Sequence, residues 1–480
     1  MNRYTLAIDA GTTNVLAMIL DDTGQVKGTA SGSYNLSFPS AGLVELDPES
    51  LWRTTLNAIG TALASSGVDA VDLAAIGITG QRTTIVIWER DTGKSVGPAV
   101  VWQDQRGKRR ADELLEQGFL TSNSLAAVSK MEQVLDGLPD GRDRLNNNQL
   151  AWGNVDSFLA WRLSGGTIHV TDASNASATG YFDFLTEWKW FDSLLKVQNL
   201  PCSFFPEVVD SVGIMGHTDA ELLGAKIPIG AIIGDQQSAL YAEACLEPGM
   251  AKITYGTSGT CDINSGDELR LATGAYPSVA WTREGERTFL VEGMVITAGA
   301  VFGWLTQLGI LDDPAQAASL GRMRSDAGGV SFLPALQGLG TPHNIHDRFG
   351  AFEGLTSATS REHIVRAAIE GVAFRVREMV DQIYQDSALP RPSVLRVDGG
   401  AAVNDLLMQN QANVLGCAIE RMEPTEATAY GAALLAGEAC GVWEPGSSAS
   451  LRRVDRSFEP QWSESEREER FGQWKSVFRL

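Results

Sequence analysis

The sequence predicts an α/β protein made of two similar lobes, and three observations point to this class. The chain has 480 residues, of which 44% are hydrophobic and 20% charged, so it can form two or three domains with separate cores. Strand and helix patterns are mixed along it. A strand, a Gly-Thr turn and a second strand occur around Gly11 and again, half a chain later, around Gly256. We therefore expect two α/β lobes, at residues 1–244 and 245–480.

The first lobe is expected to open with an antiparallel meander. Two β-rich runs flank the turn at Gly11, and a third strand follows the polar turn at residues 21–24. A second pair of strands is predicted at residues 74–79 and 84–90, separated by a four-residue turn. Helices are expected at residues 48–65 and 156–163.

Near the middle of the chain the pattern begins again with a strand that ends in a carboxylate, Asp235, followed by a short helix at residues 237–243. The strand pair around Gly256 comes next. The clearest helix spans residues 361–386, with apolar positions three and four apart and Thr359 with Glu362 as its capping box. Further elements are predicted as strands at 394–397 and 417–422, helices at 404–415 and 426–441, and a solvated helix at 463–470.

The charge balance restricts the partners of the chain. With 59 acidic and 38 basic residues the net charge is −21, so nucleic acid is not an expected partner. No stretch approaches 18 uncharged apolar residues, and the run from Tyr4 to Ile8 is too short for a signal sequence. We expect a cytoplasmic protein without a membrane partner. An anionic ligand must be held locally, by backbone amides and a metal ion.

Two Gly-Thr turns are candidate phosphate sites. In the first, consecutive amides and hydroxyls after Asp9 could surround phosphate oxygens while Asp9 holds hydrated Mg²⁺. A hairpin turn that uses Gly and Thr for local hydrogen bonds is the alternative. The second turn, at Gly256, favours the phosphate interpretation. Gly399 and Gly400 follow a strand and could support an adenosine group, or simply begin the next helix. Neither GxGxxG nor GxxxxGK[ST] is present.

Residues at three strand ends are candidates for substrate chemistry. Asp235 could accept the proton of a hydroxyl that attacks phosphorus, or only cap the helix that follows. Arg82 and Trp102 follow strands in the first lobe and together offer a guanidinium and a planar wall to a small polyhydroxylated ligand. Taken singly, Arg82 could be a surface ion-pair member and Trp102 a core residue.

In this order the motifs resemble those of the FGGY family of carbohydrate kinases, most closely its glycerol-phosphorylating branch. The resemblance runs from about Tyr4 to Gly441. Its most specific stretches are residues 77–82 (Gly-Ile-Thr-Gly-Gln-Arg), 101–104 (Val-Trp-Gln-Asp), 234–237 (Gly-Asp-Gln-Gln), 350–355, 363–370 and 397–404 (Val-Asp-Gly-Gly-Ala-Ala-Val-Asn).

The resemblance implies two actin-like (ribonuclease H-like) lobes around a deep interdomain cleft, with ATP on the second lobe and a polyol or sugar on the first. The implied reaction is ATP-dependent phosphorylation of a terminal hydroxyl, as in glycerol metabolism, with Mg²⁺ as the metal. Asp235 would be the general base and Asp9 the residue that organises Mg²⁺. Implied phosphate contacts are Gly11, Thr12, Thr13, Gly256 and Thr257. Implied adenosine contacts are Gly299, Gly303, Gly400 and Asn404. Implied substrate positions are Arg82, Thr83, Trp102, Leu125, Gln236 and Thr260.

Four of these positions depart from the glycerol-phosphorylating pattern. Thr83 replaces a Glu, Leu125 a Tyr, Thr260 an aromatic residue and Gly303 a Gln. A lost carboxylate removes a strong hydroxyl acceptor, and lost rings enlarge a pocket, so an erythritol-type or a xylulose- or ribulose-type kinase is the alternative. A non-catalytic actin-like ATPase module is the third hypothesis. The sequence is compatible with a homo-oligomer.

Overall fold

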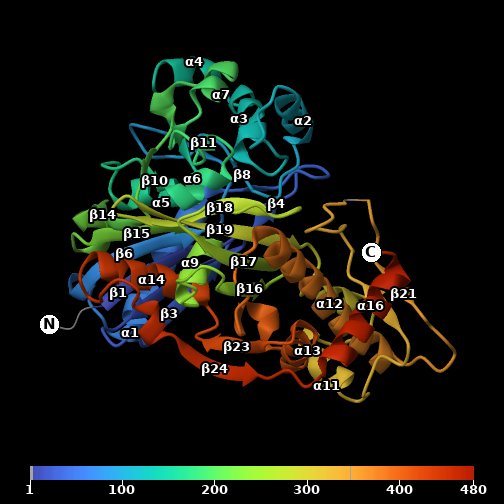
Figure 1. Cartoon of the computed structure of the whole chain (residues 1–480). Helices are drawn as coiled ribbons and strands as arrows, with labels where there is room; N and C mark the ends of the chain where they lie inside the picture. The colour runs from blue at the N-terminus through green and yellow to red at the C-terminus, as the bar shows by residue number, and fades with distance from the viewer. Residues whose placement is uncertain (1–3, 346) are drawn as a thin grey trace. The chain divides into compact units, whose positions relative to one another are not determined.

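The computed structural model describes residues 4–345 and 347–480, and these form two compact units (Figure 1). The first unit consists of the chain up to Ala242 together with Ser278–Thr288 and Thr428–Leu451. The second consists of Glu243–Pro277, Phe289–Ala427 and Arg452–Leu480. Both units combine strands and helices, which confirms the α/β class.

The first unit is built on a sheet in which parallel strands end at the same edge. β1 (Tyr4–Ala10), β2 (Asn14–Leu20) and β3 (Val26–Ser33) form the predicted antiparallel meander. β6 (Leu73–Gly80) runs parallel to β1, and β15 (Pro228–Gly234) runs parallel to β6 (Figure 1). Ala10 and Gly234 both lie opposite Gly80. The carboxyl ends of β1, β6 and β15 therefore lie side by side.

The prediction that residues 74–79 and 84–90 form a strand pair is wrong. β6 lies between β1 and β15, so both of its edges are already occupied. β7 (Val86–Glu89) instead pairs antiparallel with β9 (Leu150–Gly153) in a separate two-stranded sheet. The segment between β6 and β7 includes Thr83 at φ 59°, a left-handed conformation that interrupts the extended chain.

Local signals explain the helices that cover the first unit. α1 (Pro48–Ser66) begins where Asp47 accepts a hydrogen bond from the Glu49 amide and ends at Gly67, which has φ 69°. α5 (Val155–Leu163) and α9 (Asp235–Ala242) lie close to the predicted ranges. α14 (Ala427–Ala439) approaches β6 so closely that a Cβ on Gly77 would lie 2.2 Å from the Ala432 carbonyl oxygen.

The second unit has strands in the order β24-β23-β22-β16-β17-β19. β16 and β23 run parallel to β22, and β17 runs antiparallel to β16. The strand bounds are β16 (Ala251–Tyr255), β17 (Gly259–Gly266), β19 (Glu286–Val295, from Phe289 in this unit), β22 (Val394–Asp398), β23 (Ala418–Glu423) and β24 (Arg453–Phe458).

Three helices of the second unit pack against one another (Figure 1). They are α12 (Arg361–Ser387), α13 (Asp405–Leu415) and α16 (Glu464–Phe478). The capping box of α12 consists of Ser360 and His363, one residue beyond the predicted pair. α16 is longer than predicted and is not merely solvated, because Phe471, Trp474 and Phe478 are buried.

Shorter elements connect these parts. Among the described residues the further helices are α2 (Lys108–Glu116), α3 (Ala127–Asp136), α4 (Gly141–Asn146), α6 (Ala173–Ala178), α7 (Asp192–Val197), α8 (Ala220–Leu223), α10 (Ala300–Gln307), α11 (Ala317–Gly321) and α15 (Ser448–Leu451). The further strands are β4 (Leu36–Ser37), β5 (Glu45–Leu46), β8 (Ala99–Val100), β10 (Val170–Asp172), β11 (Phe182–Asp183), β12 (Lys189–Trp190), β13 (Glu207–Val209), β14 (Val212–His217), β18 (Tyr276–Arg283), β20 (Ser331–Leu333) and β21 (Ala351–Glu353). Across residues 4–345 and 347–480, none of the helices has both the length and the apolar character needed to cross a membrane.

Candidate active site

Three strand ends of the first unit bring polar side chains together. Asp9 is the second-last residue of β1, Arg82 comes two residues after β6, and Asp235 directly follows β15. The Arg82 Nε atom lies 3.3 Å from Asp235 Oδ1. The carboxyl edge of parallel strands is where α/β proteins place their ligands, so this group is the leading candidate for the site.

Asp235 is held in position but remains open to solvent. Its Oδ1 atom also accepts a hydrogen bond of 2.8 Å from the Gln236 amide, in the first turn of α9. The side chains of Asp235 and Arg82 are 30% and 15% exposed. A carboxylate that is oriented by a guanidinium and still accessible can accept a proton from a bound hydroxyl.

Asp9 lies close enough to Asp235 for their charges to interact. Burial raises the pKa of Asp9 from 3.8 to about 7, and the negative charge of Asp235 raises it as well. A cation beside Asp9 would favour its ionised form. No group of three or more His, Cys, Asp or Glu residues within the described chain could hold a metal ion. Asp9 would therefore be the single carboxylate ligand of a Mg²⁺ ion whose other ligands are water and phosphate oxygens.

The first Gly-Thr turn is tied to the substrate candidates. The Gly11 carbonyl accepts hydrogen bonds from the Tyr34 hydroxyl and from Gln81 Nε2, the latter at 3.1 Å. The Trp102 indole donates to Thr12 Oγ1 at 3.1 Å. The structure therefore joins a residue of the implied phosphate group to one of the implied polyol group. Thr13, at the tip of the turn, is exposed.

Two other implied substrate positions, Thr83 and Leu125, lie in irregular segments of the first unit. Thr83 adopts φ 59°, which is unusual for a β-branched residue. Leu125 precedes α3, its amide donates to Asn123 Oδ1 at 2.9 Å, and its side chain is 38% exposed.

The implied phosphate turn of the second unit packs against the start of α10. The Gly299 amide donates to the Gly256 carbonyl at 3.0 Å, and the Ala300 amide donates to the Thr257 carbonyl at 3.1 Å. A Cβ on Gly299 would lie 2.3 Å from the Gly256 oxygen, so only glycine fits there. Gly303 lies within α10, where a Cβ would meet open space.

The adenosine candidates lie beside that turn. Gly399 has φ 89°, and a Cβ there would lie 2.7 Å from the Tyr255 carbonyl oxygen, while Gly400 faces open space. Asn404 caps α13, because its Oδ1 accepts hydrogen bonds from the amides of residues 406 and 407 at 3.1 and 3.0 Å. Thr260, within β17, is only 5% exposed.

A buried ion pair beneath these turns was not anticipated. Lys252 Nζ lies 2.8 Å from Asp262 Oδ2, and both side chains are fully buried. Lys252 also donates to Thr254 Oγ1 at 2.6 Å, and its charge acts on Asp398, which precedes Gly399. The sequence signal that could have revealed this pair is the single charged residue in each of two otherwise uncharged strands, Lys252 in β16 and Asp262 in β17.

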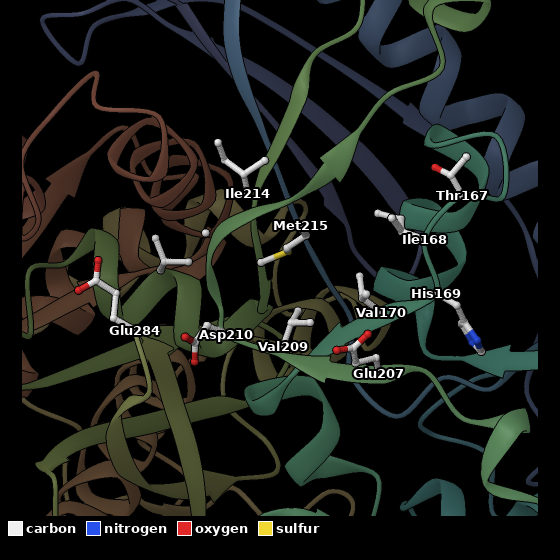
Figure 2. A pocket seen from close by; sticks show the side chains of 12 residues that line it. Thr167, Ile168, His169, Val170, Glu207, Val209, Asp210, Ile214, Met215 and Glu284 are labelled. Atoms are coloured by element: carbon white, nitrogen blue, oxygen red, sulfur yellow. The ribbon is translucent and has the colours of Figure 1, made fainter.

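A separate pocket lies in the first unit, away from the named site residues (Figure 2). It has a volume of about 570 Å³, apolar side chains such as Ile168 and Met215, and the carboxylates of Glu207, Asp210 and Glu284. None of the implied substrate, phosphate, adenosine or metal positions lines it.

Comparison with known proteins agrees with the motifs. Residues 4–242 match the N-terminal domain model of the FGGY family of carbohydrate kinases, and residues 251–440 match its C-terminal domain model. The chain is 40% identical to a glycerol kinase of Deinococcus radiodurans, over 99% of this chain and 97% of that protein. It is 41% identical to a glycerol kinase of Aromatoleum aromaticum, over 98% of this chain and 97% of that protein.

Solved structures show the same fold. A glycerol kinase of Plasmodium falciparum, determined with ADP, superposes with a TM-score of 0.92 and 28% identity, over 100% of this chain and 98% of that one. A xylulose kinase of Brucella ovis gives a TM-score of 0.88 at 23% identity, over 99% of both chains, and is similar in fold alone. The chain therefore belongs to the FGGY family of carbohydrate kinases and has the actin-like, two-domain α/β fold of that family.

Proposed function

We propose that this chain transfers the terminal phosphoryl group of ATP to a terminal hydroxyl of a small polyol, and that glycerol is the first candidate substrate. Family membership supports the reaction class, and about 40% identity to proteins named glycerol kinase supports the substrate. The observation that carries the mechanism is the contact between Arg82 and Asp235 at adjoining strand ends, with Asp9 beside them.

In the proposed reaction Asp235 is the general base. The substrate oxygen forms a bond to the terminal phosphorus as the bond from that phosphorus to ADP breaks, and the hydroxyl proton moves to the Asp235 carboxylate. Arg82 restrains the carboxylate and is available to a second hydroxyl. Trp102 and Gln236 supply the remaining wall of the polyol site. Leu125 and Thr260 are the positions at which substrate size is set, and Thr83 is the position at which a carboxylate acceptor is replaced.

We assign the polyol to the first unit and the nucleotide mainly to the second. Gly11, Thr12 and Thr13 are proposed phosphate contacts on the first unit. On the second unit the proposed contacts are Gly256 and Thr257 for the phosphates, Gly299, Gly303, Gly400 and Asn404 for adenosine, and Thr260 for the far end of the substrate. The hydrogen bond from the Gly299 amide to the Gly256 carbonyl supports this assignment, because it fixes the Gly256 turn relative to the start of α10.

Mg²⁺ is the proposed metal, held by Asp9 together with phosphate oxygens and water. When bound it would neutralise charge on the transferring phosphoryl group. The raised pKa of Asp9 supports this role, because the carboxyl lies in a place that favours a compensating cation.

The Asp235→Asn variant tests the proposed base. We expect kcat to fall by about 10² to 10⁴, because the amide cannot accept the proton, whereas ADP binding measured by calorimetry should be preserved. Asp192→Asn is the matched control, because Asp192 is an exposed residue at the start of α7 whose partner is Lys189. Retention of full activity by Asp235→Asn would contradict the mechanism.

A substrate panel tests the acceptor. Values of kcat/KM should be highest for glycerol among glycerol, erythritol, xylulose, ribulose and gluconate. A higher value for erythritol or a pentulose would replace glycerol as the substrate and leave the kinase reaction in place. ATP hydrolysis that depends on a protein partner and on no polyol would instead favour a non-catalytic actin-like module.

A further inference from the structure

The strand that delivers Asp235 loses one of its neighbours just before it ends. β14 pairs with β15 from Pro228 only as far as Ala231. Beyond that point the Ile232 amide donates to the Ser211 carbonyl at 3.1 Å, just outside β14. Among the described residues no strand pairs with the Gly234 amide on that side, and this amide donates instead to Ser174 Oγ at 2.8 Å. A side chain therefore takes the place of a strand at the residue that precedes Asp235.

Gly234 is a position where such support matters. A Cβ there would lie 2.5 Å from Gln237 Oε1 and 2.9 Å from Arg82 Cδ, so any larger residue would displace one of these side chains. Glycine leaves the backbone more freedom than any other residue. The hydrogen bond from its amide to Ser174 restrains that freedom at the bond leading into Asp235.

Ser174 is itself firmly anchored. It lies in the first turn of α6 and is fully buried. Asp172 is the N-cap of this helix. Asp172 also accepts hydrogen bonds from the amides of Ser174 and Asn175 at 3.0 and 2.9 Å. Ser174 is therefore held to Asp172 through its amide, and its hydroxyl accepts from the Gly234 amide.

Both supports of the end of β15 converge on Asp172. Ser211, whose carbonyl accepts from Ile232, donates its hydroxyl to Asp172 Oδ2 at 2.6 Å. Asp172 is fully buried, and hydrogen bonds to a carboxylate are shorter and stronger than those between neutral groups. A buried polar network with its members paired is rigid.

We infer that Ser174, anchored by Asp172, is a positioning residue that fixes the location of the Asp235 carboxylate. This inference rests on the proposed function, in which Asp235 is the base. Ser174 touches neither substrate nor nucleotide in this account. It acts through the backbone of Gly234, and a displacement of about 1 Å in a reacting group can cost a factor of about 10² in rate.

Ser174→Ala is the direct test. We expect kcat to fall by about 10- to 100-fold, while KM for ATP stays close to its wild-type value, because the base moves and the nucleotide turns do not. Ser174→Thr keeps the hydroxyl and should recover most of kcat. Ser157→Ala is the matched control, since Ser157 is equally buried, lies in α5 of the same unit, and has a hydroxyl without a hydrogen-bond partner among the described residues.

Parallel measurement of Asp235→Asn separates the two hypotheses. If Asp235→Asn is inactive and folded Ser174→Ala has the kcat of Ser157→Ala, the positioning role is refuted and the kinase mechanism stands. If Asp235→Asn is fully active, the proposed base is wrong. Should Ser174→Ala fail to fold, Ser211→Ala removes one anchor of Asp172 and leaves the Gly234 amide paired. We expect a fall in kcat of about 2- to 5-fold for it, and unchanged kcat would overturn the inference.

Discussion

Replacement of Lys252 by Met would test how strongly the second unit depends on its buried ion pair. Lys252 Nζ lies 2.8 Å from Asp262 Oδ2 with both side chains fully buried. Burial alone would lower the pKa of Lys252, but the charges of Asp262 and Asp398 raise it above its usual value. Without the ammonium, two buried carboxyl groups lose their shared cation.

The expected loss of stability is large for a single substitution. Removing one partner of a buried ion pair costs about 3 to 5 kcal/mol, because the remaining charge is left without compensation. Met occupies a similar volume to the lysine stem, so the cavity contribution is small. For a domain of about 200 residues, each kcal/mol corresponds to about 2 to 4 °C in Tm, and we expect Tm to fall by about 6 to 20 °C.

Urea and thermal unfolding would measure the change, with KM for ATP as a second readout because β16 and β22 lead into the proposed nucleotide turns. Lys189→Met is the control, since Lys189 is 49% exposed and ion pairs between exposed side chains, such as those with Glu187 and Asp192, contribute little to stability. Adding Asp262→Asn to Lys252→Met should restore part of the stability. A Lys252→Met protein as stable as the control would refute this reasoning.

Gly234→Ala should lower kcat/KM by about tenfold or more, because the new Cβ would displace Arg82 or Gln237 beside the proposed base. Steady-state kinetics would measure this, with Gly60→Ala as a control whose Cβ meets open space in α1. Burial lowers the pKa of His169 to about 4. Between about pH 6.5 and pH 4 the unfolded chain therefore binds a proton at this residue and the folded chain does not. The free energy of unfolding of the wild type should therefore fall by about 1 to 3 kcal/mol from pH 7 to pH 4 relative to that of His169→Phe. Urea unfolding at several pH values would measure this, and the same pH dependence in both proteins would contradict it.

Elements that depend on local signals could be predicted from the sequence. α1 was expected at residues 48–65 and spans Pro48–Ser66, because its cap, its apolar spacing and its terminal glycine are all adjacent in the chain. The pairing of β7 could not be predicted in this way. Whether β6 has a free edge depends on β15, which lies about 150 residues further along the chain. The end of α16 was missed because Phe471, Trp474 and Phe478 continue its apolar spacing past the charged stretch.

The candidate site shows the same division between local and long-range information. Asp9, Arg82 and Asp235 were each recognised as residues at strand ends, but their proximity requires the register of three parallel strands. Their roles stay predictions. Ser174 was not recognised, because an ordinary helical serine acquires its importance only from the amide that it meets across the unit.

The way in which α14 docks also bears on the order of events during synthesis. Gly77 and Gly431 have no room for side chains, since a Cβ on either would lie about 2 Å from the Ala432 or Ser238 carbonyl oxygen. Thr428–Leu451 thus completes the first unit although it is synthesised after most of the second unit. The nascent N-terminal half must wait for almost the entire polypeptide before its core closes, so a fragment ended at residue 242 would be left with an uncovered apolar surface.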